Sequence, residues 1–89
     1  MSLDTTEASL DDRIRATVAE SLGIHLSEVT HESDIVANLG ADSLDCIELA
    51  MSIEQEFGIS MSNDQMDEVD TVQELIDYVI VAIHERDLW

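Results

Sequence analysis

The chain has 89 residues and a formal net charge of −18, because 21 aspartates and glutamates stand against three arginines and no lysine. This balance excludes nucleic-acid binding, which needs a basic surface, and it disfavours binding to anionic membranes. Hydrophobic residues make up 45% of the chain but aromatic residues only 3%, so we expect one small core of aliphatic side chains.

A first helix is predicted over residues 9–22 and ends at Gly23, a residue that favours helix C-termini. Its apolar residues recur at every fourth position: Leu10, Ile14, Val18 and Leu22. Residues 24–42 follow as a long loop whose isolated apolar side chains attach it to the core. Loops of this length are often functional, and this one leads to Ser43.

A second helix is predicted over residues 43–57, with Asp42 as its N-cap and Gly58 at its end. One apolar line of this helix suits the core and contains Cys46, Leu49, Ala50, Ile53 and Phe57. A second apolar line contains Leu44, Ile47 and Met51. An apolar line beside glutamates is typical of a docking surface, although a helix buried on two sides has the same pattern.

Two capping-box patterns mark the remaining helices. Ser62 followed by Gln65 predicts a short third helix to about Val69, and Thr71 followed by Glu74 opens a fourth. The apolar residues of the fourth helix have helical spacing: Val72, Leu75, Ile76, Val79, Ile80 and Ile83. The sequence thus predicts an all-α fold, a small four-helix bundle with a long loop between the first two helices and a short third helix.

We expect a single domain over residues 1–89, with a flexible start at residues 1–8 and a C-terminal extension at residues 84–89. The extension is expected to pack on the bundle and to bury Trp89 in part. Methionine side chains, which adapt their shape, are expected to let the domain repack around a guest or a partner: Met51, Met61 and Met66.

The sequence offers little for catalysis or for a metal site. His25, His31 and His84 share no metal-ligand spacing and are expected to be solvated. The surroundings of Ser43 lack the G-x-S-x-G pattern of serine hydrolases and a histidine nearby in sequence. No segment has the ligand spacing of a calcium-binding loop. We therefore expect no catalytic residue and no metal ligand.

Ser43 lies between a glycine turn and a helix start, where a second protein has access to its hydroxyl. The alternative is that Asp42 or Ser43 only caps the helix, since both residue types favour that position. The surrounding sequence is Leu39-Gly40-Ala41-Asp42-Ser43-Leu44-Asp45.

This run resembles the serine motif of bacterial acyl carrier proteins, and the resemblance continues through Glu48-Leu49, Glu56-Phe57-Gly58-Ile59 and Thr71-Val72-Gln73. It extends over residues 10–80 in family order and spacing. The resemblance implies that a phosphopantetheinyl transferase loads Ser43 with 4′-phosphopantetheine from coenzyme A. The thiol of that arm would carry acyl groups as thioesters, so the protein would be a carrier and not an enzyme.

The resemblance also implies a partner-recognition surface on the second helix, formed by Asp42, Leu44, Asp45, Ile47, Glu48, Met51 and Glu54. Its partners would be the transferase and the basic surfaces of acyl-processing enzymes such as synthases and acyltransferases. The cargo stays open between fatty-acid and related lipid or polyketide intermediates. A peptidyl or aminoacyl carrier and an unmodified acidic interaction module are the alternatives.

The chain departs from the family at several positions. Ser62 replaces a common proline, and Ala37-Asn38 replaces a common acidic pair, which weakens any divalent-ion site near the serine. Cys46 is expected to pack in the core. This lone cysteine cannot form an internal disulfide, and the first residues lack the features of a signal peptide, so we expect a cytoplasmic monomer without a membrane span.

Overall fold

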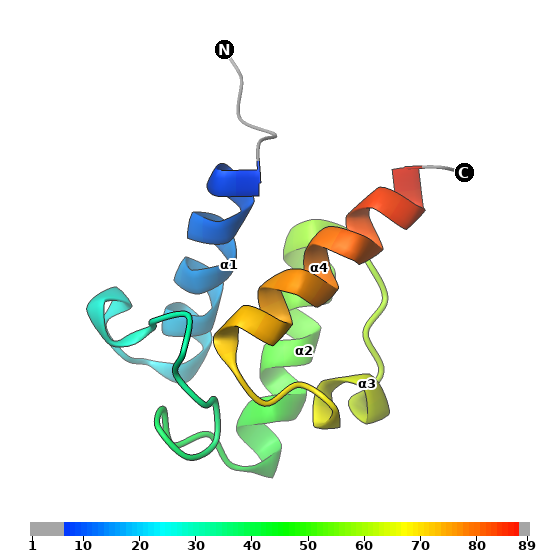
Figure 1. Ribbon diagram of the computed structural model, residues 1–89. Helices are drawn as coiled ribbons and strands as arrows, with labels where there is room; N and C mark the ends of the chain where they lie inside the picture. Colours follow the sequence, from blue (N-terminus) through cyan, green and yellow to red (C-terminus); the bar gives the residue numbers. More distant parts are fainter. Residues whose placement is uncertain (1–6, 88–89) are drawn as a thin grey trace.

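The computed structural model describes residues 7–87, and within this range the chain forms four α-helices and one short 3-10 helix (Figure 1). The elements are α1 (Glu7–Leu22), η1 (Leu26–Glu28), α2 (Ser43–Phe57), α3 (Asn63–Asp67) and α4 (Val72–Asp87). The expected all-α fold with a long first loop and a short third helix is confirmed. Among these residues no helix is long and apolar enough to cross a membrane.

The helices pack around α2. α1 packs against both α2 and α4, and α3 packs on α2. α2 begins at the end of the bundle that lies away from the start of α1 and the end of α4 (Figure 1). The long loop ends there, so the fold presents the first turn of α2 at one pole of the molecule.

The core is aliphatic, as the composition predicts. Its fully buried side chains come from α1, the first loop, α2 and α4: Ile14, Val18, Val29, Ile35, Leu49, Ile53, Val72, Leu75, Ile76 and Val79. Met61 and Met66 are also buried, whereas Met51 is exposed and belongs to the surface. Cys46 is only half-buried at the edge of the core.

The first loop is attached to the start of α4 by backbone hydrogen bonds. The Ile35 amide donates to the Asp70 carbonyl over 2.9 Å, and the Val72 amide donates to the Ser33 carbonyl over 3.0 Å. Asp34 and Thr71 form an isolated antiparallel bridge at this place. Together with buried Val29 and Ile35, these bonds give the loop a fixed path to α2.

Both chain ends differ in part from the expected boundaries. α1 begins at Glu7, two residues before the predicted start, so residues 7 and 8 belong to the helix. α4 continues through Asp87 and includes most of the expected extension. Residues 1–6 and 88–89 lie outside the described part of the chain, and so does the expected burial of Trp89.

Candidate functional site

A reciprocal capping box starts α2. The Asp42 carboxylate accepts a hydrogen bond from the Asp45 amide over 2.8 Å, and the Asp45 carboxylate accepts one from the Asp42 amide over 3.2 Å. Gly40 precedes the cap with a φ of 78°, a left-handed conformation that favours glycine. Asp42 is therefore the N-cap, as predicted, and Asp45 completes the box.

Ser43 is the first residue of α2 and its side chain is exposed. Because Asp42 caps the helix, Ser43 is not needed for that purpose. Its hydroxyl makes no hydrogen bond to another residue of the described part of the chain. It stands at a helix N-terminus, where backbone N–H groups and the helix dipole favour a bound anion such as a phosphate. The geometry thus suits a serine that becomes a phosphodiester.

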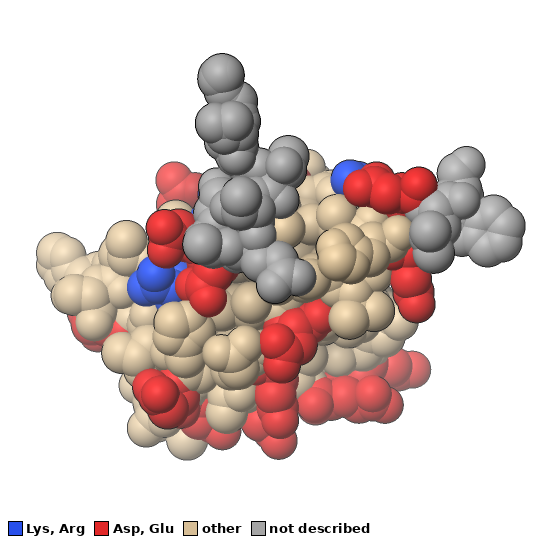
Figure 2. Space-filling view, turned by 45° about the horizontal axis from the view of Figure 1, so that its top comes forward, with Lys and Arg blue, Asp and Glu red and all other residues tan. Residues whose placement is uncertain are grey.

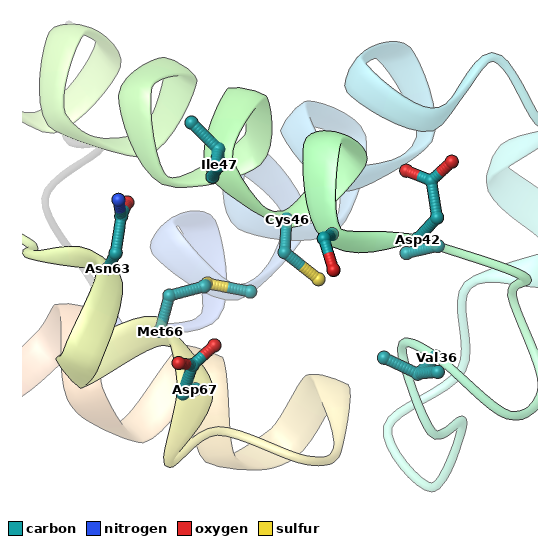
Figure 3. A pocket seen from close by; sticks show the side chains of 9 residues that line it. Val36, Asp42, Cys46, Ile47, Asn63, Met66 and Asp67 are labelled. Carbon is teal, nitrogen blue, oxygen red and sulfur yellow. The ribbon is translucent and has the colours of Figure 1, made fainter.

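An open hollow of about 480 Å³ lies beside Ser43, between the first loop, α2 and α3. Cys46 and Ile47 border it from α2, and Met66 reaches into it from α3 (Figure 3). The rest of its lining comes from Val36, Ala41, Asp42, Ser43, Asn63 and Asp67. The lining thus combines apolar side chains, such as Ile47 and Met66, with polar ones, such as Asn63 and Asp67, which suits a flexible group that leaves Ser43 and folds back. Of the α3 residues in this lining, only Met66 was expected from the sequence to adapt to a guest, because Asn63 and Asp67 reach the hollow only through tertiary packing.

The Cys46 thiol borders this hollow and has a raised pKa. Burial raises its pKa, and the negative charges of Asp67, Asp45 and Asp42 raise it further. A thiol with a raised pKa is protonated at neutral pH and is a poor nucleophile. Cys46 therefore contributes packing surface to the hollow.

The second apolar line of α2 is exposed along its whole length. Leu44, Ile47 and Met51 expose 60%, 39% and 52% of their surface. Of the two explanations left open by the sequence, burial on two sides is therefore excluded in this structure. Asp42 and Glu48 are exposed, and Asp45 is half-buried. Asp42 thus lies just before Ser43, and the other residues lie on the part of α2 that follows Ser43.

Glu54 differs from the other residues expected in partner recognition. It is half-buried, and its Oε2 atom accepts a hydrogen bond from the Met61 amide over 2.8 Å. Met61 belongs to the linker between α2 and α3. The structure thus gives Glu54 a contact within the fold that sequence reasoning missed, since no local pattern pairs a helical glutamate with a loop amide seven residues later.

The few cations lie away from the start of α2 and are paired. Arg13 reaches Glu56 at 3.3 Å, Arg15 reaches Asp11 at 2.9 Å, and Arg86 reaches Asp87 at 3.0 Å. Figure 2 shows carboxylates spread over one face, with basic atoms in two places, each beside carboxylates. The surface around Ser43 therefore has a strongly negative potential, which suits a basic partner.

One of the three histidines is not simply solvated. His31 is half-buried, and its Nε2 atom lies 2.7 Å from the Asp11 carboxylate, so the expectation was wrong for this residue. His25 and His84 are exposed. Among residues 7–87, no three His, Cys, Asp or Glu side chains gather as ligands of a metal would.

Comparison with known proteins gives the family. A family model described as a phosphopantetheine attachment site matches residues 12–79. The solution structure of a 3-oxo-butyl acyl carrier protein, an intermediate mimic from the actinorhodin polyketide synthase of Streptomyces coelicolor, is 30% identical, with 96% of this chain and 98% of that chain covered and a TM-score of 0.69. The 3,7-dioxo-octyl actinorhodin acyl carrier protein of the same organism is 29% identical, with 97% and 99% covered and a TM-score of 0.66. The chain therefore belongs to the bacterial acyl carrier proteins, which bear phosphopantetheine and act as carriers and not as enzymes.

Proposed function

We propose that Ser43 is the residue that bears 4′-phosphopantetheine in this chain, and that the protein carries acyl intermediates of polyketide or fatty-acid-like biosynthesis. The observation that carries the proposal is the exposed Ser43 hydroxyl, which the Asp42 cap leaves free on the first turn of α2. Ser43 also lies within the matched residues 12–79.

The residues around Ser43 have distinct roles in this proposal. The attached arm supplies a terminal thiol that holds an acyl group as a thioester. The N-terminal N–H groups of α2 stabilise the phosphate, and the hollow next to Ser43 shelters the part of the cargo nearest the protein. The carboxylates of Asp42 and Asp45 oppose the phosphate by like charge, and the same charges attract basic groups of a partner.

Partner enzymes bind, in this proposal, to the face of α2 next to Ser43. Its exposed apolar side chains supply contact area, and its carboxylates attract basic partners and raise the rate of encounter. The face comprises Asp42, Leu44, Asp45, Ile47, Glu48 and Met51. Complementary charge suits a carrier that binds a transferase and several acyl-processing enzymes in turn and leaves each of them again.

A polyketide cargo is the narrower form of the proposal. Both similar solution structures are of carriers named for the actinorhodin system, with oxo-acyl groups attached. The mixed lining of the hollow supports this cargo, because apolar side chains together with the polar Asn63 and Asp67 suit an acyl group that carries keto oxygens.

The decisive experiment is loading with coenzyme A and a broad-range phosphopantetheinyl transferase, followed by intact-mass measurement. We expect one phosphopantetheine on the natural chain and none on Ser43→Ala. Ser27→Ala is the matched control, because it removes another exposed serine and should load normally. Loading of Ser43→Ala, or failure of the natural chain to load, would refute the proposal. Mass spectrometry of the thioester isolated from the source cells then distinguishes polyketide from fatty-acid or aminoacyl cargo.

A further inference from the structure

We infer that Glu54 and Tyr78 are positioning residues that fix the linker between α2 and α3 and thereby set the width of the hollow beside Ser43. The consequence for cargo size rests on the carrier function proposed above. The effect on the position of α3 concerns the protein without phosphopantetheine and can be tested separately.

Two successive linker residues are held by side chains from two different helices. Glu54 of α2 accepts a hydrogen bond from the Met61 amide over 2.8 Å. The Tyr78 hydroxyl of α4 donates a hydrogen bond to the Ser60 carbonyl over 2.9 Å. The linker is therefore held between α2 and α4 just before the cap of α3.

The protonation states of the two anchoring side chains suit these hydrogen bonds. Burial raises the pKa of Tyr78, and the charges of Glu54 and Glu85 raise it further. The phenol is therefore protonated at neutral pH and donates its hydrogen to Ser60. The ionised Glu54 carboxylate can only accept a hydrogen bond, and the Met61 amide can only donate one. In both linker bonds a donor therefore meets an acceptor.

A third contact holds the beginning of the same linker. The Nη1 atom of Arg86 donates to the Phe57 carbonyl over 2.7 Å. Gly58, the next residue, ends α2 with a φ of 66°, and a Cβ atom there would lie 3.1 Å from that nitrogen. The chain thus leaves α2 along a path restrained at Phe57, Ser60 and Met61.

Backbone hydrogen bonds hold the chain that follows α3. The Asp70 carbonyl accepts from the Ile35 amide, and Thr71 pairs with Asp34. α3 itself has only five residues, and a helix of this length has little stability of its own in water. Its position therefore depends on the burial of Met66 in the core and on its two ends, and the end that precedes it is held by Glu54 and Tyr78.

The position of α3 in turn decides the shape of the hollow. α3 contributes Met66, which is buried, together with Asn63 and Asp67, and these face Cys46 and Ile47 of α2 (Figure 3). When the linker is released, α3 can move away from α2 and the hollow widens. Glu54 and Tyr78 would thus limit the size of the acyl group that fits beside Ser43.

The structural test uses the apo protein and Cys46 as a natural probe. Alkylation of Cys46 by neutral iodoacetamide reports access to the hollow, and hydrogen exchange of the amides of residues 63–67 reports movement of α3. We expect Glu54→Ala and Tyr78→Phe each to raise both rates about tenfold, as expected for loss of one hydrogen bond. Alkylation rates are compared after correction for the thiol pKa of each variant.

Two controls separate positioning from charge and from general stability. Glu54→Gln keeps an acceptor oxygen and should retain the natural rates. Glu56→Ala removes a carboxylate from the same helix but not from the linker, and it should also leave both rates unchanged. Exchange of the core amides of Ile53 and Leu75 should stay slow in all variants.

Unchanged alkylation and exchange rates in both test variants, or a uniform increase in exchange that includes the core amides, would overturn the inference. Tyr78→Phe keeps the test valid if Glu54→Ala does not fold.

The cargo test uses the loaded carrier. Acyl groups of increasing length are attached through the arm, and protection of the thioester from hydroxylamine is measured. Glu54→Ala should extend protection to longer or bulkier acyl groups, whereas Glu54→Gln should not. An identical length profile for Glu54→Ala and the natural chain would refute the cargo part. Failure of Ser43 to load would refute the proposed function but leave the apo result on α3 intact.

Discussion

Asp42 and Asp45 each hold the other's backbone amide across the first turn of α2, with Ser43 between them. Each carboxylate uses one oxygen for this bond, Oδ1 in Asp42 and Oδ2 in Asp45. Asp42 precedes Ser43 directly, and Asp45 follows it by two residues. The same two residues therefore start the helix and contribute negative charge next to Ser43.

Substitution of Asp42 separates these two roles. Asparagine caps a helix about as well as aspartate, whereas alanine loses about 1 kcal/mol of stability. We expect Asp42→Asn to unfold at the same urea concentration as the natural chain, and Asp42→Ala to unfold earlier. Both variants should load more slowly than the natural chain at low salt, because both remove a charge that attracts the basic transferase. Urea unfolding and transferase kinetics at low and high salt provide the measurements.

Two outcomes would contradict this reading of Asp42. Equal unfolding of the alanine and asparagine variants would mean that the cap contributes little. If both variants load as fast as the natural chain at low salt, the transferase does not use the charge of Asp42.

Substitutions in the buried line of α2 should affect stability, whereas substitutions in its exposed line should affect partner binding. Ile53 is fully buried, so Ile53→Ala should lower the free energy of unfolding by about 2–5 kcal/mol. Ile47 is 39% exposed, so Ile47→Ser should change it by only about 0.5 kcal/mol. At a temperature where both variants are folded, Ile47→Ser should weaken partner binding, mainly through faster dissociation, and Ile53→Ala should not. Urea unfolding measures the effect on stability, and surface-binding kinetics with the transferase measure the effect on binding. If Ile47→Ser binds the transferase as tightly as the natural chain does, Ile47 does not belong to the docking face.

Local sequence patterns predicted the helix ends well because capping is decided within a few residues. The Ser62 and Gln65 side chains form the predicted reciprocal box, and Thr71 and Glu74 form the second one. Gly58 ends α2 in the left-handed conformation that its position required. In each case donor and acceptor lie three or four residues apart, so the sequence contains the whole interaction.

The first loop and the linker could not be predicted in the same way. The path of the loop depends on bonds such as Ile35 to Asp70, and the linker depends on Tyr78 contacting Ser60. These partners are distant in sequence, so no local pattern reveals them. The short helix η1 was missed for the same reason, since it lies in a loop whose shape the core determines. Glu54 was assigned to the partner-recognition surface from the family resemblance, while its hydrogen-bond partner lies in another segment of this chain.

The dense negative charge should make stability depend on salt. Paired arginines neutralise few of the 21 acidic residues, so carboxylates repel one another within the fold. Salt at about 0.1 M screens charges beyond about 10 Å and should raise the melting temperature. Magnesium chloride should raise it further than sodium chloride at equal ionic strength, because a divalent cation sits closer to paired carboxylates. In a double variant, Glu48→Gln with Asp45→Asn, the melting temperature should rise less with salt concentration. A melting temperature of the natural chain that does not change in either salt would contradict the prediction.

The contact between Asp11 and the loop predicts a specific pH dependence. Partial burial would raise the pKa of Asp11, but hydrogen bonds from Arg15 and His31, together with their charges, outweigh it and hold the pKa below its ordinary value of 3.8. A carboxyl with a lowered pKa in the folded state stabilises the fold fully above its unfolded pKa, and this contribution is lost as the pH falls through the folded value.

We therefore expect Asp11→Asn to lower the free energy of unfolding by about 1 kcal/mol at pH 7, the scale of a small exposed ion-pair network. The difference between the variant and the natural chain should shrink below the unfolded pKa of 3.8 and vanish as the pH passes the lower folded value. Asp12→Asn is the control, because Asp12 is 76% exposed and its ion pair within residues 7–87 is with Arg15, so its effect should be smaller at every pH. Urea unfolding from pH 7 down to pH 3 gives the free energy of unfolding of each variant. Taking differences between variants cancels the general loss of repulsion as all carboxylates protonate.

Since His31 also anchors the loop through its carbonyl, which accepts from the Gln73 amide, Asp11→Asn should increase hydrogen exchange of residues 30–35 more than Asp12→Asn does. A difference between Asp11→Asn and the natural chain that persists unchanged at pH 3 would show that Asp11 acts through packing and not through its charge.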